Sequence, residues 1–419
     1  MTHDNTLRFG AQTDAVTSLL RIVNLVRNGE ATTRPEIGRV TDLSRGVVTQ
    51  RISQAISMGF LVEDALAPST GGRAARSLRF TAERGRIIVC ALGALHINIG
   101  LTDLDGRIIG RSHADWEVTR GPEETIAKIF TLVDALVAEH GEAETWAVVV
   151  GLPGPVDFDS GSPVSPPIMP GWGGFDVRGS FEQRFEAPVW VDNDSNLLVL
   201  SERERFADGT GDLIYFKLGS GIGTGLLSRG RIHRGANGTA GDIGHVPVRG
   251  SEETCRCGKT GCLEAVASGW ALVRDARRAL EGGAQGLLAD RVSDGATLDL
   301  EQITLAARDG DPIALGLVER SASLVGDSIA TLVNIFNPST IVVGGAIAGA
   351  GEVFLAEVRQ RIYRHSLPLA TRDLVITTSA SDRTAPIRGG AALAIEELFE
   401  TTFPRWFAET RPTIALTRG

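Results

Sequence analysis

The sequence predicts an α/β protein in which a small helical head, residues 1–82, precedes a body with two lobes, residues 83–200 and 201–419. Three observations support this fold class. The head contains three amphipathic helical patterns followed by two short strand patterns. The body contains two separate β-hairpin patterns, each followed by helices and apolar strands. A chain of 419 residues with 42% hydrophobic residues is also longer than one ordinary domain and can fill several cores.

The charge of the chain is unevenly distributed between head and body. Residues 1–86 contain twelve arginines, no lysine and eight acidic residues, a balance of +4, whereas the whole chain carries −9 and the remainder therefore −13. A basic head on an acidic body is typical of a nucleic-acid-binding module joined to a ligand-binding body. No long apolar run and no signal-peptide pattern is present, so we expect no membrane span and no secretion. The chain has four cysteines, three of them in a ligand-like cluster, which suits a reducing cytoplasm.

The first part of the head is predicted to be helical over residues 13–28, because its apolar residues recur on one face. A second, short helix is predicted to begin after Thr33. Thr33 and Glu36 have the spacing of a capping box, and Pro35 suits a first turn. Ser44 is the predicted N-cap of a third helix, so a tight turn separates the second helix from the third.

The third helix is predicted over residues 45–58, and strands at 60–63 and 76–80 form a hairpin behind it. This order is the plan of a winged helix-turn-helix, which reads DNA with its third helix. A solvated polar face, or a winged helix that binds protein, remains the alternative. The side chains expected to contact bases or phosphates are Ser44, Arg45, Thr49, Gln50 and Arg51 on the helix, and Arg73, Arg76 and Arg79 on the hairpin.

The first lobe is predicted to open with paired strands at residues 87–92 and 97–102. A helix then leads to a buried strand at 147–150, and a further strand at 189–191 delivers the polar residues 192–196 at its carboxyl end. In an open α/β sheet that end is where ligands bind. We therefore expect a binding site there.

The second lobe is predicted to repeat this plan. A strand at residues 213–218 enters a Gly-rich turn at 219–225, and a later strand at 340–343 precedes another Gly-rich loop at 344–349. Neither loop by itself establishes a nucleotide site, because a tight hairpin or close helix packing also requires glycine. Two hairpin-led lobes around a cleft nevertheless predict an actin-like, ribonuclease-H-like kinase fold.

One imidazole and three thiols occur within eighteen residues of the second lobe. This is the donor set of a closed tetrahedral zinc site. The alternative is a metal-free cysteine cluster in a Gly-rich loop, either fully reduced or with one disulfide, but a Cys-x-Cys pair strains a local disulfide and the neighbouring glycines let the loop wrap an ion. Asp242 and Glu264 bracket the cluster, so the metal would fix a loop whose carboxylates recognise a ligand. The four donors are His245, Cys255, Cys257 and Cys262.

These motifs together resemble the ROK family, whose name joins repressors, open reading frames and sugar kinases. The matching blocks are residues 193–196, 240–245 and the Cys-x-Cys-Gly-x-x-Gly-Cys-x-Glu block at 255–264. The resemblance implies zinc on the four donors above and places Asp194 at the position of the family's general base. It also implies that sugar hydroxyls contact Asn193, Asp194, Asp242, His245 and Glu264.

The sequence departs from the family's kinases at the first phosphate loop. Those kinases carry Asp-x-Gly-Gly-Thr, whereas Ala91 and Leu95 replace the Asp and the Thr here. Phosphoryl transfer depends on positioned polar groups around the phosphates, so we expect a sugar sensor, not an enzyme, in which Asp194 is a vestigial base. Asp242 also stands where the family usually has Glu, and its carboxylate is one methylene shorter.

We therefore expect a sugar-responsive transcriptional repressor that binds operator DNA as a homodimer or homotetramer. Its effector is a sugar or a sugar phosphate, and Arg231 or Arg234 could meet a phosphate. An active ATP-dependent sugar kinase with an accessory DNA-binding head is the principal alternative. A non-catalytic protein-binding hub is a third possibility.

Overall fold

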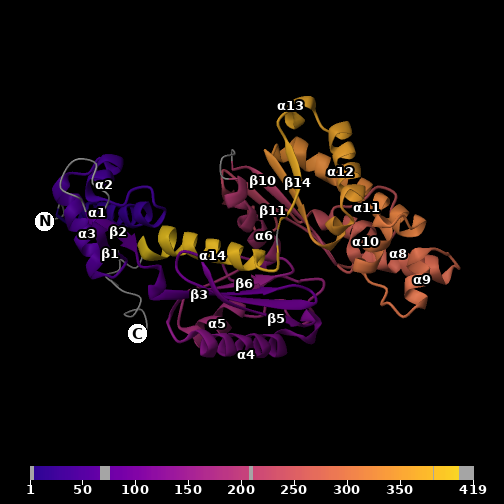
Figure 1. The fold of residues 1–419 in the computed structure, drawn as a ribbon, viewed down its shortest axis with the longest axis horizontal. Helices are drawn as coiled ribbons and strands as arrows, with labels where there is room; N and C mark the ends of the chain where they lie inside the picture. The colour runs from indigo at the N-terminus through magenta and orange to yellow at the C-terminus, as the bar shows by residue number, and fades with distance from the viewer. Residues whose placement is uncertain (1–3, 67–75, 207–210, 381, 405–419) are drawn as a thin grey trace.

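The computed structural model describes residues 4–66, 76–206, 211–380 and 382–404. A small head lies at one end of an elongated molecule, and two sheet-containing lobes follow it (Figure 1). Within these described ranges, no helix is long and apolar enough to cross a membrane.

The head has the helices and strands that the sequence predicts. Thr33 and Glu36 form the predicted capping box, and the Ser44 hydroxyl accepts from the backbone N–H of Val47. The first helix begins at Asp4, earlier than the predicted residue 13. The prediction placed the start too late because it followed the apolar periodicity, which begins only at Val16. The elements of the head are α1 (Asp4–Arg27), α2 (Arg34–Thr41), α3 (Arg45–Ser57), β1 (Leu61–Leu66) and β2 (Arg76–Phe80).

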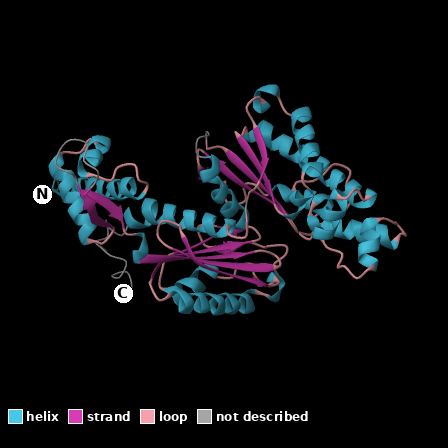
Figure 2. Cartoon of the chain, viewed as in Figure 1, coloured by secondary structure: helices cyan, strands magenta, loops and turns pink. Residues whose placement is uncertain are grey.

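The first lobe is a five-stranded sheet with the order β5-β4-β3-β6-β9. Helices cover both of its faces, with α4 and α5 on one side and α14 on the other (Figure 2). The antiparallel hairpin β3–β4 opens the sheet as predicted, and β6 and β9 add parallel strands. The elements are β3 (Gly85–Leu92), β4 (His96–Thr102), β5 (Ile108–Asp115), α4 (Pro122–His140), β6 (Glu144–Leu152), α5 (Val177–Phe185), β9 (Val189–Asn193) and α6 (Asp194–Arg203); a small hairpin is formed by β7 (Val156–Asp157) and β8 (Ser162–Pro163).

The second lobe repeats this topology with the order β12-β11-β10-β13-β14, which confirms the predicted duplication. Its strands are β10 (Leu213–Leu218), β11 (Ile222–Ser228), β12 (Arg231–Ile232), β13 (Thr340–Gly344) and β14 (Val375–Thr378). Its helices are α7 (Leu263–Ala267), α8 (Gly269–Glu281), α9 (Leu287–Ser293), α10 (Leu300–Arg308), α11 (Pro312–Phe336), α12 (Glu352–His365) and α13 (Pro368–Thr371).

The last helix, α14 (Ala385–Glu397), returns to the first sheet, although its place in the chain had assigned it to the second lobe. Glycines allow a close approach on both sides of the contact. A Cβ on Gly389 would lie 1.7 Å from the carbonyl oxygen of Leu197 in α6, and one on Gly100 of β4 would lie 2.2 Å from Ile387. Helix α14 is therefore wedged between α6 and the sheet.

Beyond α14 the chain makes a turn of π-helix, η6 (Leu398–Thr402), and reaches the head. The ring of Phe403 lies 5.5 Å from Phe60 and 5.8 Å from Trp146 of β6, and Phe399 lies 6.0 Å from Phe80. These edge-to-face contacts join head and first lobe in one continuous apolar core.

Substituting Gly389 by Ala is expected to destabilise the protein by about 2–3 kcal/mol, because the new methyl group would collide with backbone that cannot rotate away. Gly316→Ala is the matched control. Gly316 is exposed in the interior of α11 with no atom close to its would-be Cβ, so Ala there should stabilise by about 0.5–1 kcal/mol. Thermal unfolding followed by circular dichroism measures both, and equal midpoints for Gly389→Ala and wild type would contradict this packing.

Candidate functional site

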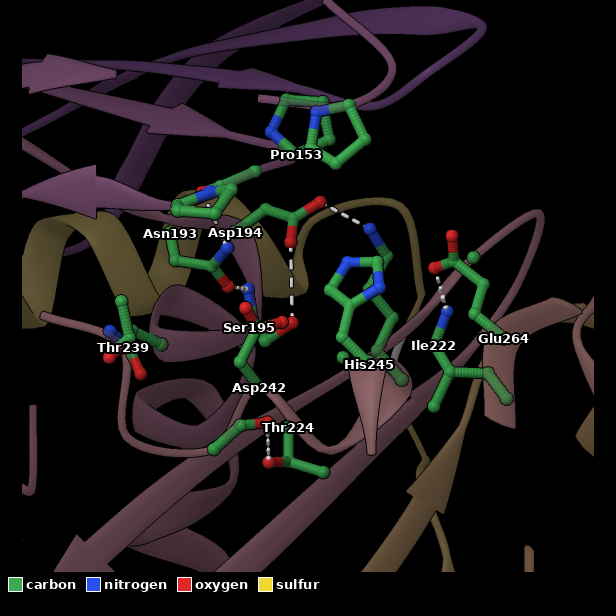
Figure 3. A pocket seen from close by; sticks show the side chains of 18 of the residues that line it. Pro153, Asn193, Asp194, Ser195, Ile222, Thr224, Thr239, Asp242, His245 and Glu264 are labelled. Carbon is green, nitrogen blue, oxygen red and sulfur yellow. Dashed lines mark hydrogen bonds and ion pairs between the residues drawn. The ribbon is translucent and has the colours of Figure 1, made fainter. Parts of the chain in front are cut away.

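A pocket lies between the two lobes and is lined by residues from both. The first lobe contributes the loop after β6 and the start of α6, and the second contributes the β10–β11 turn, the segment 238–245 and Glu264 of α7. Pro153, Pro155 and Ile168 give it apolar walls. In Figure 3 the His245 ring lies between the carboxylates of Asp194 and Glu264. Apolar walls with a few convergent polar groups are typical of a small-molecule site.

Asn193 and Asp194 stand where β9 ends and α6 begins, as the sequence predicted for the carboxyl end of a strand. The Asn193 amide donates to the carbonyl of Gly154 at 2.8 Å, and its oxygen accepts from the N–H of Ser195 at 2.8 Å. Oδ1 of the buried Asp194 accepts from the Ser195 hydroxyl at 3.3 Å. Both side chains are therefore held in fixed orientations before any ligand enters.

Lys217 forms an ion pair with Oδ2 of Asp194, a contact that the sequence analysis did not anticipate. Lys217 is the penultimate residue of strand β10, whose other residues are apolar or aromatic and buried. A lysine near the end of an otherwise apolar strand that leads into a Gly-rich turn is the signal that could have revealed this residue. Burial lowers the pKa of the nearby His96 imidazole, and the positive charge of Lys217 lowers it further. The imidazole is therefore uncharged at neutral pH.

Arg234 ties the second lobe to the first beneath the pocket. Its guanidinium donates twice to Oδ2 of the buried Asp192, at 2.7 and 3.0 Å, and lies over the ring of Phe158. The other oxygen of Asp192 accepts from Asn196 at 2.7 Å. This ion pair links the two lobes, and both oxygens of Asp192 have partners. Arg234 is therefore not available to bind a ligand.

The segment before the cysteines presents the remaining predicted site residues to the pocket. Asp242 is exposed, and its carboxylate has no partner among the residues that the structure describes. Glu264 is buried, and one of its oxygens accepts from the N–H of Ile222 at 3.0 Å. The Thr224 hydroxyl donates a hydrogen bond to the carbonyl of Gly241, which holds the segment against β11. Asp242, His245 and Glu264 thus face the same space.

The four predicted metal donors come together, with all their ligand atoms within 4.8 Å of one another. Cys257 Sγ and Cys262 Sγ are 3.7 Å apart, and Cys255 Sγ is 3.7 Å from His245 Nδ1. A tetrahedral ion with sulfur bonds of about 2.3 Å requires edges of about 3.8 Å, so the donor set fits a metal. Burial raises the pKa of the Cys255 thiol to about 12, and a bound cation would favour the thiolate instead.

The loop that carries the cysteines is braced against α8. The guanidinium of Arg256 lies 4.8 Å from the ring centre of Trp270, and that of Arg274 lies 5.1 Å from it. Arg274 also donates to the carbonyl of Ala265 at 2.9 Å and pairs with Glu253 at 3.1 Å. These contacts hold the metal-binding loop beside the first turns of α7 and α8.

The predicted DNA-contacting residues of the head do not all face outward. Ser44, Arg45, Thr49 and Gln50 are exposed on α3, and Arg76 is exposed on β2. Arg34, Arg45, Thr49 and Arg76 line a shared surface hollow between α2, α3 and the hairpin. The hairpin residue Arg73 lies outside the described residues.

Arg51 has a different environment, because it lies three residues after the buried Val48 and therefore on the flank of the inward face. Its Nε donates to the Ser18 hydroxyl of α1 at 3.2 Å, and its Nη1 donates to Gln54 at 3.1 Å. The expectation that Arg51 belongs to the exposed face of the helix was wrong: it joins α3 to α1.

Comparisons with known proteins agree with this architecture. Residues 88–397 match the ROK family, so the chain belongs to that family. The xylose repressor of Caldicellulosiruptor bescii is 28% identical over 393 residues, which cover 92% of this chain and 97% of the relative. The glucokinase of Thermotoga maritima is 30% identical over 315 residues, 75% of this chain and 98% of the enzyme.

A solved structure extends the similarity to the head. The crystal structure of a ROK family transcriptional regulator, a homolog of the E. coli MLC protein, matches with a TM-score of 0.81 and 23% identity. The match covers 95% of this chain and 100% of the regulator. The matched part of the chain, head included, therefore has the fold of that regulator.

Replacing Cys257 by Ser is expected to lower the bound metal from about one ion per chain to near zero, because a closed site with one weak donor loses most of its affinity. Cys90→Ala is the control, since Cys90 is buried in β3 away from the cluster. Elemental analysis of both purified variants measures the difference. Wild-type protein that is folded and holds no metal would contradict the assignment.

Proposed function

We propose that this protein is a transcriptional repressor whose DNA affinity is set by a sugar bound between its two lobes. One observation carries the proposal: a winged helix-turn-helix and a polar inter-lobe pocket belong to one chain, and α6, which begins at the pocket, packs in the same apolar core as the head. The similarity to a xylose repressor over nearly the whole chain supports it.

In this proposal the sugar hydroxyls bind to Asn193, Asp194, Asp242, His245 and Glu264. Carboxylate and amide groups accept from and donate to vicinal hydroxyls, and the apolar walls suit the C–H faces of a sugar ring. One carboxylate oxygen of Glu264 accepts from the N–H of Ile222, so the other oxygen can bind the ligand. The short side chain of Asp242 leaves room for a water or a bulkier substituent.

The metal in this proposal is zinc with a structural role. A Cys₃His set is closed, leaving no open position for catalysis, and thiolates favour zinc over calcium or magnesium. His245 would hold the ion through Nδ1, the ring nitrogen that lies 3.7 Å from Cys255 Sγ, which would leave Nε2 free of the ion. A bound ion would thereby fix the orientation of His245 and the adjoining segment.

We propose further that the protein does not transfer phosphate. Ala91 is buried in β3 and Leu95 is exposed in the following turn, so neither side chain offers an oxygen to a metal ion or a phosphate. Asp194 is engaged by Lys217. The similarity to a glucokinase keeps an active kinase as the competing function.

Operator DNA is the proposed partner of the head, and a palindromic operator read by paired heads requires a two-fold homodimer or a tetramer built from such dimers. Because its target is DNA, the repressor acts in the cytoplasm. Ser44, Arg45, Thr49, Gln50 and Arg76 are the proposed contact residues, to which the sequence adds Arg73.

A sugar is expected to change the affinity for operator DNA at least about tenfold, the effect of a coupling free energy of about 1.4 kcal/mol. The measurement uses the full-length protein, a duplex selected by it from a random pool, and fluorescence anisotropy with a panel of sugars chosen by thermal shift. Asn193→Ala should keep the DNA affinity and lose the sugar response. Arg45→Ala should weaken DNA binding about tenfold with or without sugar.

Salt dependence distinguishes DNA reading from protein binding, because DNA affinity should fall steeply as salt rises. If no sugar and no sugar phosphate alters operator affinity while the protein stays folded and metal-loaded, the proposed function is wrong.

ADP release in the presence of ATP, magnesium and the same sugars should stay at the no-sugar background, because the first phosphate loop lacks polar groups. Asp194→Asn is the control for contaminating kinases, since a true signal from this pocket would disappear in that variant. Sugar-dependent ADP release that Asp194→Asn abolishes would establish the kinase instead.

A further inference from the structure

Three arginines lie around the surface hollow between α2, α3 and the hairpin of the head. Arg34 is the first residue of α2, Arg45 is the first residue of α3, and Arg76 is the first residue of β2. The other residues that line the hollow are small or apolar, apart from Thr49. The hollow therefore combines positive charge with an uncharged lining, and its charge is complementary to the phosphates of DNA.

The hollow lies on the path that a DNA backbone has to take across this head. In a winged helix-turn-helix the third helix enters the major groove, and the hairpin lies against the neighbouring backbone or minor groove. Adjoining grooves of a duplex are separated by one sugar–phosphate strand. A row of phosphates therefore passes between α3 and β2, beside Arg34, Arg45 and Arg76.

One carboxylate holds two of these arginines. Glu63 of β1 pairs through Oε1 with Nη2 of Arg34 at 2.7 Å, and through Oε2 with Nη1 of Arg76 at 2.8 Å. Glu63 is not one of the residues that line the hollow. Its carboxylate therefore bridges the two guanidiniums without occupying the space where a phosphate would lie.

Backbone contacts set the distance that this bridge spans. The N–H of Leu78 in β2 donates to the carbonyl of Thr32 at 2.7 Å, and Thr33 pairs with Ser77 in an antiparallel bridge. The start of α2 is thereby fixed beside β2. The two guanidiniums extend from neighbouring backbone segments, so the side chain of Glu63 reaches both.

The bridge leaves N–H donors of both guanidiniums for a second anion. A guanidinium has five N–H donors, and each contact with Glu63 engages one of its nitrogens. The side chain of Arg76 is 66% exposed, whereas that of Glu63 is 27% exposed. Hydrogen bonds from Arg76 and Arg34 lower the pKa of Glu63, so the carboxylate stays ionised at neutral pH.

We propose that Glu63 is a positioning residue of the DNA-binding surface, and that Arg34, which the sequence analysis did not single out, is a phosphate contact. The inference rests on the proposed function and adds how its DNA-binding surface is preorganised. Glu63 holds Arg34 and Arg76 beside one backbone strand, so less side-chain entropy is lost when DNA binds. A carboxylate also repels phosphates, so charge alone predicts that its removal would strengthen binding.

Substitutions on β1 separate position from charge, with the full-length, metal-loaded protein, the duplex selected from the random pool and fluorescence anisotropy. Glu63→Asp keeps the charge but is one methylene too short to reach both guanidiniums, so it should weaken binding about fivefold. Arg34→Gln should weaken binding about tenfold and reduce the salt slope by about 1. Asp64→Asn is the control. Asp64 is exposed and lies 3.9 Å from Arg79, which Glu83 also holds, so this variant should bind at least as tightly as wild type.

Two further comparisons identify the contact as a phosphate contact made through the arginines. Because phosphates carry no sequence information, the losses should be the same on a duplex of shuffled sequence. In the double variant Arg34→Gln, Arg76→Gln, measured at low salt, adding Glu63→Asp should change the affinity by less than about twofold, because the side chains that Glu63 positions are gone.

Unchanged or tighter binding by Glu63→Asp would overturn the inference, as would an equal loss from Asp64→Asn. A fivefold loss that persists after both arginines are replaced would show that Glu63 acts through the stability of the head and would also overturn it. So would a loss from Arg34→Gln confined to the selected duplex, which would make Arg34 a base contact. If wild-type protein binds no duplex with a steep salt dependence, the proposed function itself fails.

Discussion

The structure depends on the close packing of α14 between α6 and the first sheet. Helix α6 begins with the pocket residue Asp194, and its carbonyl at Leu197 faces Gly389 of α14 with no space for a side chain. Arg203 of α6 pairs with Glu396 of α14 at 2.7 Å, and Arg231 of the second lobe pairs with Glu400 just beyond it. The same segment then inserts its phenylalanines into the head. A shift of α6 on ligand binding would therefore be transmitted to the head, because tightly packed elements move together.

The pocket combines fixed and free polar groups in a way that suits a sensor. Asn193, Asp194 and Glu264 already have partners that set their orientation, whereas the Asp242 carboxylate has none within the described ranges and can serve a ligand. Preorganised groups cost little entropy when a ligand binds, and they report its presence through the elements that carry them. The metal-binding loop contributes rigidity to this arrangement, and Lys217 contributes charge.

Local features of the fold could be predicted from sequence because short-range chemistry determines them. The capping box at Thr33, the Ser44 N-cap and the spacing of Cys255 to Cys262 each bring their partners together within a few residues. The return of α14 to the first sheet depends on a contact between residues nearly two hundred positions apart, for which periodicity carries no signal. Arg51 and Lys217 were misjudged or overlooked for a related reason: their partners Ser18 and Asp194 are brought close only by tertiary packing.

The central claim is that the pocket and the DNA-binding head are thermodynamically coupled. Coupling is reciprocal, so operator DNA must change the affinity for the sugar effector by the same factor by which the effector changes the affinity for the operator. Calorimetric titration of the effector into the free protein and into its operator complex measures this directly. The account predicts two dissociation constants whose ratio equals the effector-induced change in operator affinity. Identical effector affinities in the presence and absence of operator would contradict it.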